Sequence, residues 1–490
     1  MTNTSSQYVL PPCKTKIICT IGPGSRSVST LEQLVHEGMT IARLNFSHGS
    51  FEEHLKVITT IRTIEQKTGK VIPIMIDLPG AKIRVGKLES EPILLATGSL
   101  VSLTTKKVLG TQTCIPIDFI DLPSSVSVGN TIFLNDGFIE LLVTKIQGTD
   151  VECKVVMGGL LHSRKGVNLP GGKLHVDPVT AIDLDIVQFG LKHGISIFSA
   201  SFVEKQEDIK KIRDFTKKQE TNIFIIAKVE RDEAIQHFDE ILAVSDGIMI
   251  ARGDLGIQIP LQDVPRIQKQ LIHKANQQGK PVITATQMLK SMTENSRPTR
   301  AEVADVANAI YDGTDAVMLS EETAIGQYPV ESVSIMVKIA QATETKRNYQ
   351  EVSSTLHQQL QCTSYPGFLS IADVISYTVN QAQQLIHPRY ILVTTESGNA
   401  ARRISRFKPE SWILAFSRNP DTCRFLLFSS GIWPIHMQNP LQSWHKPILD
   451  FLKKQQLTYP GDIVLLTQRR FSKEKGRTDS FGIITINDNN

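Results

Sequence analysis

Acidic and basic side chains follow apolar runs in the middle of the chain. One run ends in Lys228 and Glu230, and the next is followed by Asp254. Carboxylate oxygens suit Mg²⁺, which usually takes one or two of them and fills its other positions with substrate phosphates and water. Arg43 and Arg84 lie earlier in the chain, and a guanidinium can bind phosphate oxygens through two parallel hydrogen bonds. These residue types indicate a site for a divalent metal and an anionic, phosphate-bearing substrate.

Eight short apolar runs, separated by amphipathic helical stretches, must position these side chains. They begin at Lys16, Thr40, Ile72, Ile195, Phe224, Gly247, Pro281 and Asp315. The alternation is typical of parallel strands joined by crossover helices, and eight such units predict a (β/α)8 barrel. In such a barrel the active site lies at the carboxyl ends of the strands.

Seven of the eight predicted strands end in polar or charged residues. These residues are Arg43, Asn45 and Ser47 after the second strand, then Asp77, Ser201, Lys228 with Glu230, Arg252 with Asp254, Thr286 and Ser320. One polar strand end means little, because loops face water and are often polar. Seven polar ends at one mouth indicate a binding or catalytic site.

Capping signals predict two helix starts near the beginning of the chain. We expect the first helix to open at Ser29, with Glu32 completing a capping box, and to stop at Gly38. We expect the second to open at Ser50, with Glu53 in the same role.

The pattern changes twice along the chain. Between Ile83 and Lys173 the helical period gives way to β-type residues and glycines, which predicts an inserted small β-barrel domain. Beyond Asn348 an open α/β sheet is expected, with a helix from Ser370, strands near Tyr390, Trp412 and Ile463, and a last strand from Gly482 to Ile486. The predicted domains are a TIM-barrel domain (1–82 and 174–348), the inserted β domain (83–173) and a C-terminal α/β domain (349–490).

Composition excludes several classes of protein. Of the 490 residues, 41% are hydrophobic and 21% charged, and 53 Lys and Arg against 49 Asp and Glu leave a net charge of only +4. This balance argues against long disordered regions and against nucleic acid as a partner. The sequence offers neither a signal peptide nor a membrane span, so we expect a cytoplasmic protein. The six cysteines form no C-x-x-C pair, which argues against a disulfide framework and a zinc site.

Several segments closely resemble pyruvate kinase. They are ARLNFSHG (42–49), AKVE (227–230), MIARGDLG (249–256), ATQML (285–289), RPTRAEVADVANA (297–309) and MLSEETA (318–324), together with NDGFIEL and KGVNLPG in the insert. The resemblance covers nearly the whole chain. It implies a glycolytic phosphotransferase that moves the phosphoryl group of phosphoenolpyruvate to ADP with Mg²⁺ or Mn²⁺, giving pyruvate and ATP.

The resemblance also implies roles for individual residues. Lys228 would neutralise the phosphoryl group and the developing enolate oxygen, and Glu230 and Asp254 would hold Mg²⁺. Substrate contacts would come from Arg43, Lys228, Gly253, Asp254 and Thr286. Thr286 and Ser320 would order the water chain that delivers a proton to the enolate carbon. Nucleotide contacts would come from Asn45, Phe46, Ser47, His48, Arg84 and Lys165; because Lys165 lies in the insert, that domain would be a lid.

One segment departs from the family pattern. Many pyruvate kinases read DTKGPEIR after the third strand and bind K⁺ beside the substrate, whereas this chain reads DLPGAKIR from Asp77 to Arg84. Leu78 replaces a threonine that can donate oxygen to the ion, and Lys82 replaces an acid. The ammonium of Lys82 would supply the charge of K⁺ and repel the ion. We therefore expect activity without K⁺, although Asn45, Ser47 and Asp77 of the monovalent site remain.

The last domain contains a second phosphate-type motif. Thr394, Thr395, Ser397, Gly398 and Asn399 lead from a strand into a helix, a geometry suited to phosphate. The resemblance suggests a phosphorylated sugar or nucleotide as an effector, and coupling through a homotetramer. Glu396 argues against a doubly phosphorylated ligand, and the basic residues Arg469, Arg470, Lys473, Lys475 and Arg477 could offset its charge.

Two alternatives stay open at this point. A metal-dependent aldolase acting on pyruvate or phosphoenolpyruvate could use the same lysine, acids and Mg²⁺. A non-catalytic scaffold or RNA-binding relative could use the Arg402–Arg403 and Arg469–Arg470 pairs, although such a protein would not need the full set of polar strand ends.

Overall fold

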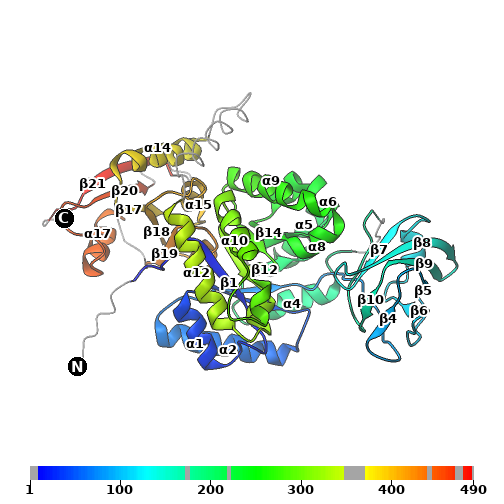
Figure 1. The fold of residues 1–490 in the computed structure, drawn as a ribbon. Helices are drawn as coiled ribbons and strands as arrows, with labels where there is room; N and C mark the ends of the chain where they lie inside the picture. Colours follow the sequence, from blue (N-terminus) through cyan, green and yellow to red (C-terminus); the bar gives the residue numbers. More distant parts are fainter. Residues whose placement is uncertain are drawn as a thin grey trace.

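The computed structural model describes residues 9–171, 177–217, 222–346, 370–438, 444–468 and 478–487. Figure 1 shows a central barrel with a small β domain at one end and an α/β domain at the other. The expected fold class is confirmed. Among the described residues, no helix combines the length and the apolar character needed to cross a membrane.

The barrel is a closed parallel sheet in the strand order β1-β16-β15-β14-β13-β12-β3-β2. All eight predicted strands are present: β1 (Lys16–Thr20), β2 (Ile41–Asn45), β3 (Ile74–Asp77), β12 (Ile197–Ala200), β13 (Phe224–Val229), β14 (Gly247–Ala251), β15 (Val282–Ala285) and β16 (Ala316–Leu319). They are apolar throughout because side chains on one face fill the barrel and those on the other pack under helices.

The helices and short 3-10 turns of the barrel domain lie outside the sheet. They are α1 (Val28–Glu37), α2 (Phe51–Thr68), α4 (Ala181–Lys192), α5 (Gln206–Lys217), α6 (Asp232–Gln236), α7 (Phe238–Val244), α8 (Arg252–Gln258), η1 (Leu261–Asp263), α9 (Val264–Gln277), η2 (Lys290–Thr293), α10 (Arg300–Asp312), α11 (Glu321–Ala324) and α12 (Pro329–Thr345).

The first predicted capping box is wrong and the second is confirmed. Helix α1 is capped two residues earlier than expected, by Ser27, whose hydroxyl accepts a hydrogen bond from the Thr30 N–H. Glu32 instead forms an ion pair with Lys67 of α2, at 2.7 Å. Two serines in the same segment offered competing caps, and Ser27 is the one with extended backbone just before the first turn. Ser50 forms the expected reciprocal box at the start of α2.

The inserted domain is built on a six-stranded sheet of order β11-β7-β8-β9-β5-β6 and a two-stranded sheet of β4 and β10. Its elements are β4 (Ile93–Leu95), β5 (Leu100–Thr104), β6 (Cys114–Pro116), α3 (Leu122–Ser125), β7 (Thr131–Leu134), β8 (Ile139–Gln147), β9 (Asp150–Met157), β10 (Gly159–Leu161) and β11 (Val167–Asn168). The domain has an apolar core of its own. Asp136 and Gly137 form the turn between β7 and β8, both with positive φ.

The C-terminal domain is a five-stranded sheet of order β19-β18-β17-β20-β21 with helices around it. Its elements are α14 (Ile371–Ile386), β17 (Tyr390–Thr394), α15 (Asn399–Ser405), β18 (Trp412–Ser417), α16 (Pro420–Leu426), β19 (Ile432–His436), α17 (His445–Lys454), β20 (Ile463–Gln468) and β21 (Ser480–Thr485). The sequence reading missed β19, which contains Pro434. Proline weakens a strand signal, and β19 accommodates it by lying at the edge of the sheet.

Candidate active site

A buried cluster of charges lies where strands β2, β3 and β13 end. The Arg43 guanidinium donates to the Asp77 carboxylate and, at 2.8 Å, to the Thr20 hydroxyl. The Lys228 ammonium lies 3.3 Å from Asp77 Oδ1 and 3.0 Å from Glu230 Oε1. The sequence expectation that these strand ends converge is therefore met for Arg43, Asp77, Lys228 and Glu230.

Asp77 is the centre of this cluster. Burial alone would raise its pKa, but Arg43, Lys228 and a 2.6 Å hydrogen bond from the Ser199 hydroxyl outweigh that effect and lower the pKa to about 2. The carboxylate thus stays ionised and holds two cations at the mouth. Ser199 escaped the sequence reading because a small residue inside an apolar strand gives no signal of a contact across the sheet.

Lys228 is charged although it is buried. Burial favours the neutral amine, but the carboxylates of Asp77 and Glu230 outweigh it and raise the pKa of Lys228 above its ordinary value. The ammonium also donates to the Ser201 hydroxyl at 2.7 Å. A buried ammonium with fixed orientation can stabilise negative charge that develops on a bound substrate.

Glu230 and Asp254 are the two candidate metal ligands. Burial raises the pKa of Glu230; the Lys228 ammonium opposes this, and the neighbouring carboxylate of Asp254 adds to it. The other oxygen of Glu230 accepts from the Phe202 N–H at 2.8 Å, while Asp254 Oδ1 lies 3.3 Å from the Lys82 ammonium.

Two neighbouring carboxylates fit Mg²⁺ as protein ligands, because this ion takes its remaining ligands from substrate and water. Within the described ranges, no group of three or more His, Cys, Asp or Glu side chains could form an all-protein metal cage.

Thr286 has an unusual backbone conformation at the end of β15. Its φ is 69°, a left-handed value that is rare for a β-branched residue. Three hydrogen bonds hold it there. The Thr286 hydroxyl accepts from Gly253 N–H at 2.7 Å and donates to Ala285 O at 2.6 Å. The Arg252 guanidinium donates to Thr286 O at 3.0 Å. Strain that is held in this way often marks a functional site.

The Ser320 loop is tied to the loop that follows Thr286. Buried Glu322 accepts from the Ser320 N–H at 2.7 Å and from the Leu289 N–H at 3.0 Å. Ser320 and Thr286 are thereby fixed relative to each other. The sequence reading did not single out Glu322, because its partner Leu289 is distant along the chain.

The segment Asn45–His48 continues from β2 along the mouth. Phe46 N–H donates to Asp77 O at 3.1 Å, and Ser47 N–H donates to the Asn45 side chain at 3.1 Å. Burial, and then the nearby cations Arg84, Arg43 and Lys82, lower the pKa of His48. This segment therefore belongs to the same positively charged mouth.

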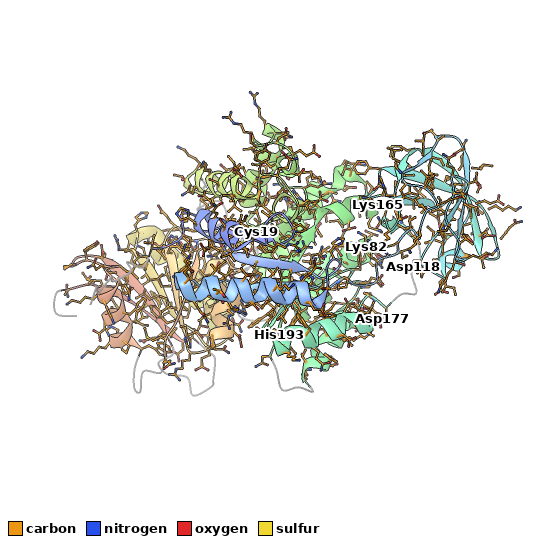
Figure 2. All side chains as sticks on the ribbon, turned by 90° about the horizontal axis from the view of Figure 1, so that it is seen from below. Cys19, Lys82, Asp118, Lys165, Asp177 and His193 are labelled. Carbon is orange, nitrogen blue, oxygen red and sulfur yellow. The ribbon has the colours of Figure 1, made fainter. Side chains whose placement is uncertain are left out.

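Arg84 and Lys165 lie where the inserted domain joins the barrel. Arg84 pairs with Gly166 in an isolated bridge, and the Lys165 carbonyl accepts from Val85 N–H at 2.9 Å. Figure 2 shows Lys82 and Lys165 close together on the side of the barrel that faces the inserted domain. A small cavity beside them is lined by Phe202, Glu230, Arg231, Val167, Asn168 and Leu169, among others.

Lys82, which we expect to supply the charge of K⁺, has a carboxylate partner of its own in the structure. Its ammonium pairs with Asp254 and lies 5.9 Å from the centre of the Phe202 ring. Asp77 is already paired with Arg43 and Lys228. The positive charge that balances Asp77 thus comes from these two residues, and Lys82 pairs with Asp254 instead.

The predicted effector loop lies between β17 and α15. Gly398 has a φ of 80° and caps α15, and its N–H donates to the Thr395 hydroxyl at 3.0 Å. The Asn399 side chain accepts from Arg402, and Glu396 and Ser397 are exposed. Thr394 ends the strand. The basic residues Arg469, Arg470, Lys473, Lys475 and Arg477 lie outside the described residues.

Comparison with known proteins gives a consistent result. Residues 13–333 match the family model "Pyruvate kinase, barrel domain", and residues 373–484 match "Pyruvate kinase, alpha/beta domain". A pyruvate kinase of Thermococcus litoralis is 47% identical over 94% of this chain and 96% of its own length. A Bacillus licheniformis pyruvate kinase is 41% identical over 97% of this chain and 81% of its own.

The fold is similar as well. A crystal structure of a pyruvate kinase from Cryptosporidium parvum superposes with a TM-score of 0.89 at 35% sequence identity, covering 97% of this chain and 96% of that one.

Proposed function

The chain belongs to the pyruvate kinase family and is a phosphotransferase, and we propose that it transfers the phosphoryl group of phosphoenolpyruvate to ADP in glycolysis, in the cytoplasm. The observation that carries the proposal is the buried array of Arg43, Asp77, Lys228 and Glu230 at the barrel mouth. The family assignment disfavours the aldolase and scaffold alternatives, because the matched relatives are pyruvate kinases over nearly the whole chain.

In the proposed reaction the bond between the phosphorus and the enol oxygen breaks, and a bond to a terminal oxygen of ADP forms. Such a transfer depends chiefly on positioning and on stabilisation of charge. Arg43, oriented by Asp77, binds the phosphoryl oxygens. Lys228 stabilises the transferred group and then the enolate oxygen that is left behind.

The metal would be held by Glu230 and Asp254. When bound, Mg²⁺ or Mn²⁺ supplies Lewis-acid stabilisation of the substrate oxygens. The ammonium of Lys82 lies 3.3 Å from Asp254 in the structure and would have to yield this carboxylate to the ion.

The enolate becomes pyruvate when its carbon is protonated. We assign the ordering of the proton-delivering water chain to Thr286 and Ser320, whose relative position Glu322 maintains. Gly253 and Asp254, at the start of α8, contact the substrate beside them.

Nucleotide contacts are assigned to Asn45, Phe46, Ser47, His48, Arg84 and Lys165. The inserted domain (83–173) acts as a lid that keeps water from competing with ADP. Its tip already reaches the barrel: a Cβ on Gly137 would lie 3.4 Å from Ile257 of α8, the helix that carries Asp254.

We also propose that turnover does not require K⁺. Cations of the protein already occupy the carboxylates around the monovalent site, since Arg43 and Lys228 neutralise Asp77. In addition, Lys82 stands where related sequences carry an acid. Equal turnover in potassium, sodium and tetramethylammonium buffers is expected, and a strict need for K⁺ would contradict this part of the proposal.

Regulation is assigned to the C-terminal domain (349–490). A phosphorylated sugar or nucleotide would bind Thr394, Thr395, Ser397, Gly398 and Asn399, and a homotetramer would couple that loop to the catalytic barrel (1–82 and 174–348). The exposed carboxylate of Glu396 favours a ligand with a single phosphate.

The test is pyruvate formation from phosphoenolpyruvate and ADP with Mg²⁺. Lys228→Met should lower kcat by about a thousandfold, because it removes the buried charge that the transition state needs. The matched control is Lys210→Met, in an exposed pair with Glu207, which should leave kcat unchanged. Full activity of Lys228→Met, or no turnover by the unmodified chain, would contradict the proposed function.

A further inference from the structure

His54 is a buried histidine of α2 that the proposed reaction does not use. Its side chain is only 8% exposed, and its ring lies behind the segment Asn45–His48. Burial lowers the pKa of His54, and the hydrogen bond to His48 opposes that effect without cancelling it. The lowered pKa favours the neutral form of the ring.

Two contacts connect this ring to the segment. The Nε2 atom of His54 lies 2.8 Å from the carbonyl oxygen of His48. A carbonyl only accepts hydrogen bonds, so Nε2 carries the proton and donates it. The ring also stacks on Phe46, with 3.9 Å between centroids and 14° between planes.

These contacts complete the restraints on the segment. Its start is held at the barrel by Phe46 N–H, which donates to Asp77 O, and its middle by the bond from Ser47 N–H to the Asn45 side chain. The carbonyl of His48, at its far end, is held by His54. Gly49 follows with a φ of 79°, and a Cβ at this position would lie 3.4 Å from His54 Nε2.

Phe46 is also held on its other sides. Its ring contacts Phe51 of α2 at 5.9 Å and Phe189 of α4 at 5.8 Å between centroids. Consequently His54 joins a packed aromatic cluster to a polar loop, and supplies both a flat apolar surface and one hydrogen-bond donor. Among the standard side chains, neutral histidine combines these two properties in a small ring.

We propose that His54 is a positioning residue for nucleotide binding: it holds the segment Asn45–His48 in the shape that presents Ser47 and His48 to ADP. This inference rests on the proposed function of that segment and adds a residue to it. Loss of the donor should weaken ADP binding specifically, because the phosphoenolpyruvate contacts come from Arg43, Lys228 and the loops after β14 and β15.

Two variants of His54 separate the two contacts, and a third variant serves as a control. His54→Phe keeps a ring against Phe46 but removes the donor, and His54→Gln keeps a donor but removes the ring. The matched control is His193→Phe, the same exchange at a histidine of the same cluster, whose ring contacts Phe189 at 4.5 Å. Figure 2 labels this residue on the lower side of the barrel.

The measurements are kcat, the KM values for ADP and phosphoenolpyruvate, the dissociation constant of ADP from equilibrium dialysis, and Tm. His54→Phe should raise the KM and Kd for ADP about fivefold, the size expected for one lost hydrogen bond. The KM for phosphoenolpyruvate, kcat and Tm should change little. His54→Gln should recover most of the ADP affinity, and His193→Phe should behave as the unmodified chain.

Other results would overturn the inference. One is an unchanged ADP affinity in His54→Phe. The other is a lower Tm together with a rise in both KM values that His54→Gln does not reverse, because this result would indicate a structural role alone. If the unmodified chain binds ADP but forms no pyruvate, the proposed function fails, while a fivefold weaker binding of ADP to His54→Phe would still support the inference.

Discussion

The barrel meets a neighbouring domain at each end, and the two junctions differ in kind. At its amino-terminal end, the floor, Phe425 and Phe428 of the C-terminal domain pack against the apolar residues that fill the barrel. Phe425 stacks on Phe224 with 4.2 Å between ring centroids. At the mouth, where the chain leaves the barrel for the inserted domain, Lys82 of the barrel pairs with Asp254 at 3.3 Å.

The ion pairs at the two ends of the barrel also differ in burial. At the floor, Lys408 and Asp315 form an ion pair at 2.6 Å with both side chains under 5% exposed, and the Lys16 ammonium donates to Ile432 O at 2.7 Å. At the mouth, Lys82 and Asp254 are each about one quarter exposed. Water can replace the contact between Lys82 and Asp254 at little cost, but not the contacts of the floor.

This difference fits the proposed roles of the two domains, a lid that moves and a regulatory domain that stays attached to the barrel. A lid has to open and close during turnover, which requires contacts that break easily. The C-terminal domain could transmit the proposed regulatory signal only if it is mechanically connected to the barrel. The buried apolar contacts and ion pair at the amino-terminal end of the barrel supply such a connection.

The largest effect is expected from breaking the floor. Asp315→Asn should lower the free energy of unfolding by about 3 kcal/mol or more, because the buried Lys408 ammonium loses its carboxylate partner. Urea denaturation measures this, with Lys210→Met as the exposed-pair control. A loss no larger than in the control would remove the distinction between the two junctions.

We expect burial, rather than position at the mouth or the floor, to decide the strength of a charge contact. Asp77 lies at the mouth but is buried, and its pKa is lowered to about 2 from an ordinary value of 3.8. Between these pH values the unfolded chain binds more protons than the folded one, so stability should fall as the pH decreases through this range, by about 2 kcal/mol in total.

Acid titration of the unfolding free energy in the unmodified chain and in Asp77→Asn checks this contribution. The variant should start from a lower stability, because Arg43 and Lys228 lose their carboxylate, and should then lose less on acidification. Identical acid dependence in both proteins would contradict the assignment of the low pKa to Asp77.

The smallest effect is expected from Lys82→Met at the exposed mouth. Its pair with Asp254 is partly solvated, so the free energy of unfolding should change by less than about 1 kcal/mol. Urea denaturation under the conditions used for Asp315→Asn gives the comparison. A loss equal to that of the floor variant would mean that the charge pair at the mouth is as strong as the one at the floor.

Much of the fold could be predicted because it depends on local pattern. The eight apolar runs of the barrel all became strands, and Ser50, Glu53 and Gly38 marked helix ends as expected. The failures were also local. Ser27 competed with Ser29 for one helix start, and Pro434 concealed a strand that the sheet edge tolerates.

The sequence by itself determined which residue types stand at the strand ends, and therefore the class of chemistry that the mouth can perform. Only the tertiary structure decided which groups meet, such as Asp77 with Ser199 and Lys82 with Asp254. The hydrophobic periodicity of helices and strands and the capping of helices depend on residues within a few positions of one another. Contacts between distant residues follow from strand order and packing, which no local spacing specifies.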